Sequence, residues 1–245
     1  MNALARQYFF IFVGLIFATT LHASETCGDE VKLLLAPAQA QSAASALNAG
    51  KQQHSQIYFY DTPQLDLLAK GLILRIRQGA DNDFTVKLRP HSEQQFSARV
   101  TGNKDFKCEG EVVNGEESPS YSVKVDYTDS SVPETGNDLS ALLSRDQARL
   151  LKASGIVVDW AHVRRIMEIQ STSWAVRSQS AQLDKLSLEL WEWPGGKSLE
   201  LSTKVAADKG SATFVELKNV AKRNHLDLSP DQRPKTSTAL RSIEK

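Results

Sequence analysis

The segment YFYDTPQLDLLAKGLILRIR, at residues 58–77, decides the fold together with TVKLR at residues 85–89. In both segments apolar residues alternate with cations, and those cations are Arg75, Arg77, Lys87 and Arg89. A period of two is typical of β-strands, so each strand has one apolar face and one face with paired cations. Like charges on neighbouring strands destabilise a sheet. A dense anion between the strands would explain why four cations share one surface.

The same pattern recurs elsewhere in the chain. Other segments with strand-like alternation carry charged residues at alternate positions on one face, namely Glu30, Lys32, Lys107, Glu109, Glu111, Arg164, Glu168, Glu189, Glu200 and Lys204. For any single strand, the solvated face of an antiparallel sheet explains such charges. Repetition over five or six strands, with Arg and Lys beside Glu, favours one shared polar surface. Both interpretations stay open from the pattern alone.

Periodicity and turn residues predict many strands and several helices. Strands are expected at residues 30–35, 56–60, 72–78, 84–90, 96–101, 106–113, 121–127, 161–170, 174–178, 186–193 and 198–204. Helical segments are expected at residues 37–48 and 62–70, after the capping box at residues 144–147, and at residues 213–224, before a polar tail. Without regular βαβ alternation, this order indicates an α+β fold or a barrel.

The N-terminus has the composition of an export signal. Arg6 precedes an apolar run at residues 8–18 that is too short to span a bilayer, and Leu21, His22 and Ala23 follow it. We expect a signal peptide at residues 1–23, cleaved near Ala23, and one domain at residues 24–245 in the periplasm or outside the cell. An uncleaved anchor is the alternative. After cleavage no membrane span is expected.

Charge and cysteine content narrow the possible partners. The 245 residues contain 29 basic and 29 acidic residues, and residues 1–23 contain one Arg and no acid, which leaves 28 against 29. This balance argues against a general nucleic-acid binder, which would carry a basic excess. Cys27 and Cys108 have the opposite parity to the acids beside them, so both point away from the charged face. In an oxidising compartment we expect them to form a disulfide.

The residues quoted above resemble a known family. Tyr-Phe-Tyr-Asp-Thr-Pro, a Leu-rich segment, Gly71, Leu-Arg-Ile-Arg and Val-Lys-Leu-Arg are similar to the N-terminal half of CYTH domains, also called triphosphate tunnel metalloenzymes. That family includes inorganic triphosphatases, thiamine triphosphatases and class IV adenylate cyclases. The similarity extends more weakly from about Gly28 to the C-terminus. It implies a closed antiparallel barrel of about eight strands, with a polar tunnel inside and helices packed outside.

The resemblance also assigns roles to residues. It implies phosphate binding by Lys32, Arg75, Arg77, Lys87, Arg89 and Arg164, and strand alternation adds Lys107 and Lys204 on the same charged face. It implies Mg²⁺ or Mn²⁺ binding by Glu30, Glu109, Glu111, Glu189 and Glu200, because these hard cations bridge carboxylate and phosphate oxygens. A one-residue slip would exchange Arg164 for Arg165.

Two family acids are missing from the motifs. The opening Glu-x-Glu-x-Lys motif falls on residues 28–32, where Gly28 replaces the first Glu, and the late Glu-x-Glu falls on residues 200–202, where Ser202 replaces the second. This chain therefore matches the cations of the family's motifs better than it matches their acids. The leading hypothesis is an exported protein that binds, and with a divalent metal hydrolyses, inorganic triphosphate or polyphosphate. The alternatives are a polyanion-binding module without turnover and an envelope scaffold without a specific ligand.

Overall fold

The computed structural model describes residues 27–177, 179–180, 183 and 185–244. The predicted signal peptide lies outside these residues. Among the described residues, the helices are all too short or too polar to cross a membrane.

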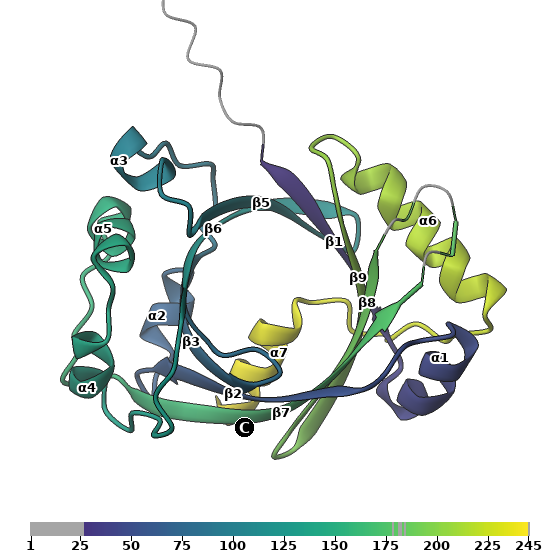
Figure 1. Cartoon of the computed structure of the whole chain (residues 1–245), viewed down its shortest axis with the longest axis horizontal. Helices are drawn as coiled ribbons and strands as arrows, with labels where there is room; N and C mark the ends of the chain where they lie inside the picture. The colour runs from purple at the N-terminus through teal and green to yellow at the C-terminus, as the bar shows by residue number, and fades with distance from the viewer. Residues whose placement is uncertain (1–26, 178, 181–182, 184, 245) are drawn as a thin grey trace, which may run out of the picture.

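The described residues form one closed β-barrel of nine strands, in the order β1-β5-β6-β4-β3-β2-β7-β8-β9 (Figure 1). The strands are β1 (Gly28–Leu35), β2 (Gln53–Asp61), β3 (Leu72–Gly79), β4 (Asp83–Leu88), β5 (Phe106–Val113), β6 (Glu116–Asp126), β7 (Arg164–Val176), β8 (Leu186–Trp193) and β9 (Gly196–Val205). The predicted α+β barrel is confirmed, with nine strands in place of about eight.

One ladder differs from the expected antiparallel barrel. β1 pairs in parallel with β5, in the register Glu30↔Glu111, and antiparallel with β9, in the register Lys32↔Ser202. β1 and β5 are not consecutive in the chain, so no hairpin forces them to run in opposite directions. The barrel therefore closes through a parallel seam.

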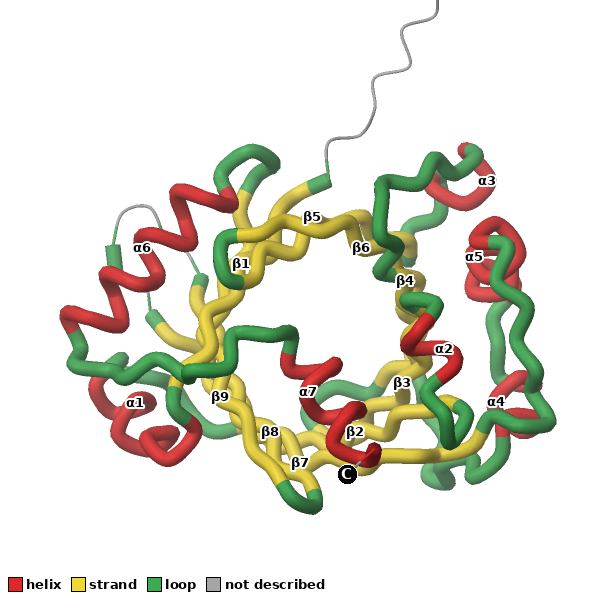
Figure 2. The backbone as a smooth tube through the Cα atoms, turned by 180° about the vertical axis from the view of Figure 1, so that it is seen from behind, coloured by secondary structure: helices red, strands yellow, loops and turns green. Residues whose placement is uncertain are grey.

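The helices lie around the barrel and at one of its ends (Figures 1 and 2). They are α1 (Ala40–Ala46), α2 (Asp66–Ala69), α3 (Ala98–Thr101), α4 (Gly136–Ala141), α5 (Arg145–Ser154), α6 (Gly210–Arg223) and α7 (Lys235–Arg241), with 3-10 turns at Pro37–Gln39 and Ser242–Glu244. α6 buries Phe214 and Leu217 against Leu33 of β1, and α5 belongs to the cluster around Ile76 and Phe84. Much of the apolar core thus lies between barrel and helices. The interior is left to other side chains.

Local sequence signals set several of these elements. Ser144 and Gln147 form the expected capping box at the start of α5, with distances of 2.9 and 3.1 Å between the paired nitrogen and oxygen atoms. Gly155 ends the same helix with φ of 71°, a conformation that favours glycine. The helix expected at residues 213–224 is α6, which begins three residues earlier.

Three expectations about elements are wrong. Residues 96–101 do not form a strand: β5 already pairs with β1 and β6, so no edge is free, and residues 98–101 form α3 instead. Residues 161–170 and 174–178 are not two strands, because β7 runs unbroken beside β2 and β8; residue 178 lies outside the described residues. The polar tail contains α7, since Ala239 and Leu240 are buried against the barrel.

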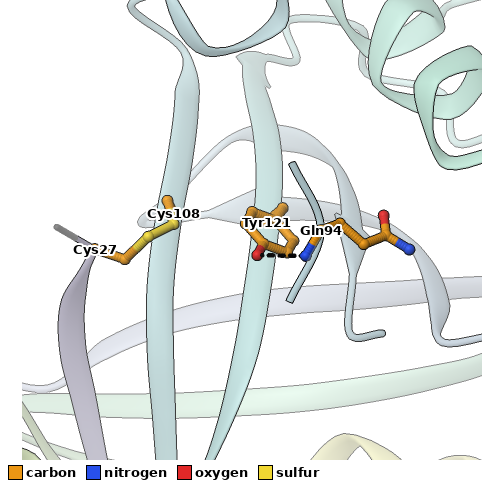
Figure 3. The surroundings of a disulfide bond; sticks show 4 residues. All are labelled: Cys27, Gln94, Cys108 and Tyr121. Carbon is orange, nitrogen blue, oxygen red and sulfur yellow. Dashed lines mark hydrogen bonds between the residues drawn. A yellow bond between two sulfur atoms is a disulfide. The ribbon is translucent and has the colours of Figure 1, made fainter. Parts of the chain in front are cut away.

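The predicted disulfide is confirmed. Cys27 and Cys108, 81 positions apart in the chain, are joined with a Cα–Cα distance of 5.0 Å (Figure 3). The bond lies one residue before the pair Gly28↔Glu109, at the start of the parallel seam. It therefore links covalently the two strands that close the barrel.

Candidate functional site

The barrel encloses a polar cavity of about 620 Å³. Its lining contains ten cations, Lys32, Arg75, Arg77, Lys87, Arg89, Lys107, Lys124, Lys185, Lys204 and Lys235, and four acids, Glu30, Glu109, Glu189 and Glu200. Small barrels usually fill their interior with side chains. Here the volume lies in the range of ligand sites, and cations dominate its wall.

Strand alternation places the central cations. On β3, Leu74 and Ile76 are buried in the apolar cluster beneath α5, so Arg75 and Arg77 project to the other side, into the cavity. On β4, the same alternation turns Lys87 inward. The inward faces of β3 and β4 thus form one continuous cationic wall.

Glu111 is the centre of the first charged cluster. Its carboxylate is 1% exposed and contacts Lys32 at 3.4 Å, Lys87 closely, and Arg89 at 2.8 and 3.0 Å. Burial raises the pKa of Glu111, but Arg89, Lys32 and Lys87 together hold it well below its usual range. Lys32 also contacts Glu30 at 2.8 Å. The cluster is an ionised network inside the barrel.

Lys87 has an unusual titration in this network. Burial lowers the pKa of its ammonium to about 8; Glu111 opposes this shift, while Arg89 and Lys32 add repulsion. For Glu30, burial raises the pKa, but Lys32 and Lys87 outweigh this and bring it to about 2.

Asp83 is the centre of a second cluster that the sequence analysis missed. Its carboxylate is 2% exposed and lies 3.3 Å from both Arg75 and Arg77 and 4.0 Å from Lys124. It falls in the gap between the strands expected at residues 72–78 and 84–90, as a turn residue would, yet Asp83 is the first residue of β4.

The C-terminal segment supplies a third charged group, which the sequence pattern also did not predict. Lys235, the first residue of α7, contacts Glu189 closely and Glu200 at 2.9 Å, and its ammonium lies 4.4 Å from the centre of the Trp191 ring. α7 lies across part of one end of the barrel (Figure 2). Ala239 and Leu240, four and five positions after Lys235, are buried in an apolar cluster with the barrel, although the tail around them is mostly polar.

The remaining predicted cations and acids divide into two groups. Lys107, Lys204 and Glu109 line the cavity, and Lys204 contacts Glu109. Arg164 does not line it and is exposed, so its predicted place in the lumen is wrong. Arg165 is no substitute, because it contacts Glu134 at 2.5 Å and packs over Tyr58.

The predicted charged face of β7 points outward. Met167 and Ile169 belong to an apolar cluster with Phe59 of the lumen wall, whereas Glu168 is exposed and accepts a hydrogen bond from Gln56. A bulge opposite Phe59 and Tyr60 shifts the register at the start of β7. For this strand the solvated-face interpretation was the right one.

The acids do not form a ready metal site. Among the residues that the structure describes, no three His, Cys, Asp or Glu side chains gather in a way that could hold a metal ion. Glu30 and Glu111 share Lys32, and Glu189 and Glu200 share Lys235. In this arrangement each predicted metal ligand is paired with a lysine ammonium, which a divalent cation would have to displace.

Comparison with solved structures shows which known proteins share this fold. No family model and no curated protein matches the chain. Among solved structures, a candidate adenylyl cyclase from Hippeastrum, described as having a dominant triphosphatase activity, is similar with a TM-score of 0.57 and 18% identity, over 88% of this chain and 95% of the other. A candidate adenylate cyclase from Bacillus halodurans is similar with a TM-score of 0.55 and 13% identity, over 86% and 97%. The chain has the fold of the CYTH-like adenylyl cyclase and triphosphatase proteins.

Proposed function

We propose that this chain binds inorganic triphosphate or polyphosphate inside the barrel. The observation that carries the proposal is the convergence of Arg75 and Arg77 of β3, Lys87 of β4 and Arg89, the residue after β4, on one cavity. Ten cations line that cavity against four acids, and even with the buried Asp83 and Glu111 the cations stay in excess. Arg grips phosphate oxygens in a bidentate way and Lys acts as a point charge.

Unused donors support an anionic ligand. Arg75 Nε and Arg89 Nη1 are buried and have no hydrogen-bond partner within the described part of the chain. Buried polar groups are normally hydrogen-bonded, and an unpaired one costs free energy. A phosphate chain offers several oxygens to such donors at once.

Export supports an inorganic ligand over a nucleotide. The signal-like residues 1–23 and the Cys27–Cys108 bond suit a periplasmic or secreted protein, because disulfides persist in oxidising compartments. Nucleoside and thiamine triphosphates are chiefly intracellular, whereas inorganic polyphosphate is also accessible outside the cell.

Hydrolysis with Mg²⁺ or Mn²⁺ is the second candidate. The triphosphatase activity described for the Hippeastrum protein favours it. The acids available for a metal are Glu30, Glu109, Glu111, Glu189 and Glu200, most of which are paired with lysines here. A metal would have to displace those lysines, so binding alone is the function that this arrangement supports best.

Titration calorimetry with tripolyphosphate tests the proposal. We expect binding by the wild type and a loss of about tenfold to a hundredfold in Arg75→Ala and in Lys87→Ala, because a charged hydrogen bond contributes about 1.5–3 kcal/mol. Lys152→Ala, on the exposed face of α5, is the control and should bind as the wild type does. Equal affinity in all four proteins would refute a lumen site.

Phosphate release separates binding from turnover. The same proteins are incubated with tripolyphosphate and Mn²⁺, with and without a chelator. Binding without phosphate release would identify a binding module without turnover. Phosphate release that requires Mn²⁺ and is lost in Arg75→Ala would identify a hydrolase.

A further inference from the structure

Asp83, on β4, contacts three cations that come from two neighbouring strands, β3 and β6. Arg75 Nη2 donates to Asp83 Oδ1 at 3.3 Å, Arg77 Nε lies 3.3 Å from Oδ2, and Lys124 Nζ lies 4.0 Å from the same oxygen. Thr85 donates to Oδ1 at 2.7 Å and accepts from Arg75 at 3.2 Å. The β3–β4 register sets this arrangement, since Arg77 lies opposite Asp83 and Arg75 opposite Thr85.

The Asp83 cluster is less tightly paired than the Glu111 cluster. Glu111 has Arg89 contacts of 2.8 and 3.0 Å, and Glu30 shares its lysine. The contacts of Asp83 with cations begin at 3.3 Å; Arg77 also donates to Asp81 at 2.6 Å, but Asp81 is exposed, so Asp83 is the buried acid of this cluster. Arg75 keeps a buried Nε without a hydrogen-bond partner in the described chain. This end of the cationic wall therefore retains the capacity to bind an anion.

We propose that Asp83 is a positioning residue, which with Thr85 holds Arg75 and Arg77 in the orientation that receives a phosphate group. This inference rests on the proposed function and names the residue that shapes its site. Arg75 and Arg77 lie two positions apart on one face of β3, so without an acid between them they repel. A carboxylate that engages one edge of each guanidinium fixes its plane and leaves Nε of Arg75 for the ligand, whereas Nη1 of Arg77 already donates to the exposed Asp81 at 2.6 Å.

A simple counter-charge would behave in the opposite way. If Asp83 only neutralises positive charge, its removal raises the potential of the cavity and tightens the binding of a polyanion. If Asp83 positions the arginines, its removal weakens binding although a negative charge is lost, because the freed side chains must be ordered by the ligand. The sign of the change decides between the two roles.

The experiment compares Asp83→Asn with Asp126→Asn by titration calorimetry with tripolyphosphate. Asp126 lies opposite Asp83 in the β4–β6 ladder and is exposed, so its substitution removes the same charge from the same end of the barrel. We expect at least tenfold weaker binding for Asp83→Asn, and equal or slightly tighter binding for Asp126→Asn. Thr85→Val, which removes only the hydroxyl bridge, should weaken binding by a smaller factor.

Each outcome is decisive. Binding by Asp83→Asn that equals or exceeds that of the wild type overturns the positioning role and leaves the proposed function intact. No binding by the wild type overturns both. Circular dichroism of the free variants establishes folding; if Asp83→Asn does not fold, Thr85→Val decides, and an unchanged affinity in that variant refutes the inference.

Discussion

The replacement of Glu111 by Gln is the perturbation with the largest expected effect on the free protein. Glu111 is 1% exposed and is the shared partner of Lys32, Lys87 and Arg89. Glutamine keeps the shape of the side chain and removes its charge, which leaves three cations facing one another in the lumen. Removing one partner of a buried ion pair costs about 3–5 kcal/mol.

This cost translates into a measurable shift in thermal stability. For a protein of this size, 1 kcal/mol shifts the unfolding midpoint by about 2–4 °C, so Glu111→Gln should unfold about 6–20 °C below the wild type. Tripolyphosphate should restore much of the loss, because an anion that binds the folded state stabilises it by about 2.7 kcal/mol at a hundred times its Kd. The ligand should therefore raise the midpoint of the variant as well as that of the wild type.

Scanning calorimetry with and without tripolyphosphate measures both effects, and Glu109→Gln is the matched control. Glu109 lies two residues earlier on the same face of β5 and contacts Lys204, whose side chain is 61% exposed. A pair this exposed contributes at most about 1 kcal/mol. Equal midpoints for the Glu111 and Glu109 variants would refute the view that Glu111 holds the cationic lumen together.

Three further predictions follow from individual groups. Phosphate binds the charged form of Lys87, whose pKa is about 8, so the affinity for tripolyphosphate should fall as pH rises through 8. Calorimetry from pH 7 to 9.5 should show a flatter dependence of affinity on pH for Lys87→Arg. Parallel pH profiles for the wild type and this variant would contradict the assignment. Burial raises the pKa of Glu189, but the charge of Lys235 outweighs burial and lowers this pKa to about 2. The stability that the pair contributes is therefore present above about pH 4.5 and is lost as pH falls towards 2. Lys235→Met should therefore lower the urea midpoint at pH 7 and much less at pH 3, whereas equal losses at both values would exclude the ion pair as the cause. Replacing both Cys27 and Cys108 by Ser should lower the free energy of unfolding by about 2–5 kcal/mol in guanidinium titrations, and no loss would show that the seam is stable without the bond.

The inward-facing cations could be predicted from the sequence because alternation fixes which side of a strand a residue occupies. Once Leu74 and Ile76 are buried beneath the helices, Arg75 and Arg77 have only the lumen to enter. The disulfide was predictable in the same way, from parity and from the expected compartment.

Features that depend on distant parts of the chain were not predictable. Lys235 reaches the lumen only because α7 docks by Ala239 and Leu240, which no local pattern reveals. Asp83 resembles a turn residue until β4 is known to begin with it. Arg164 was misplaced because the luminal face of β7 carries Met167 and Ile169, so the charged face of this strand, with Glu168, is the solvated one.

The measurement that tests the central claim most directly is a crystal structure of the protein soaked with tripolyphosphate. We predict density for the anion inside the barrel, within hydrogen-bonding distance of Arg75, Lys87 and Arg89. Density confined to the outer surface, or an empty lumen at a concentration that saturates binding in solution, would contradict the account.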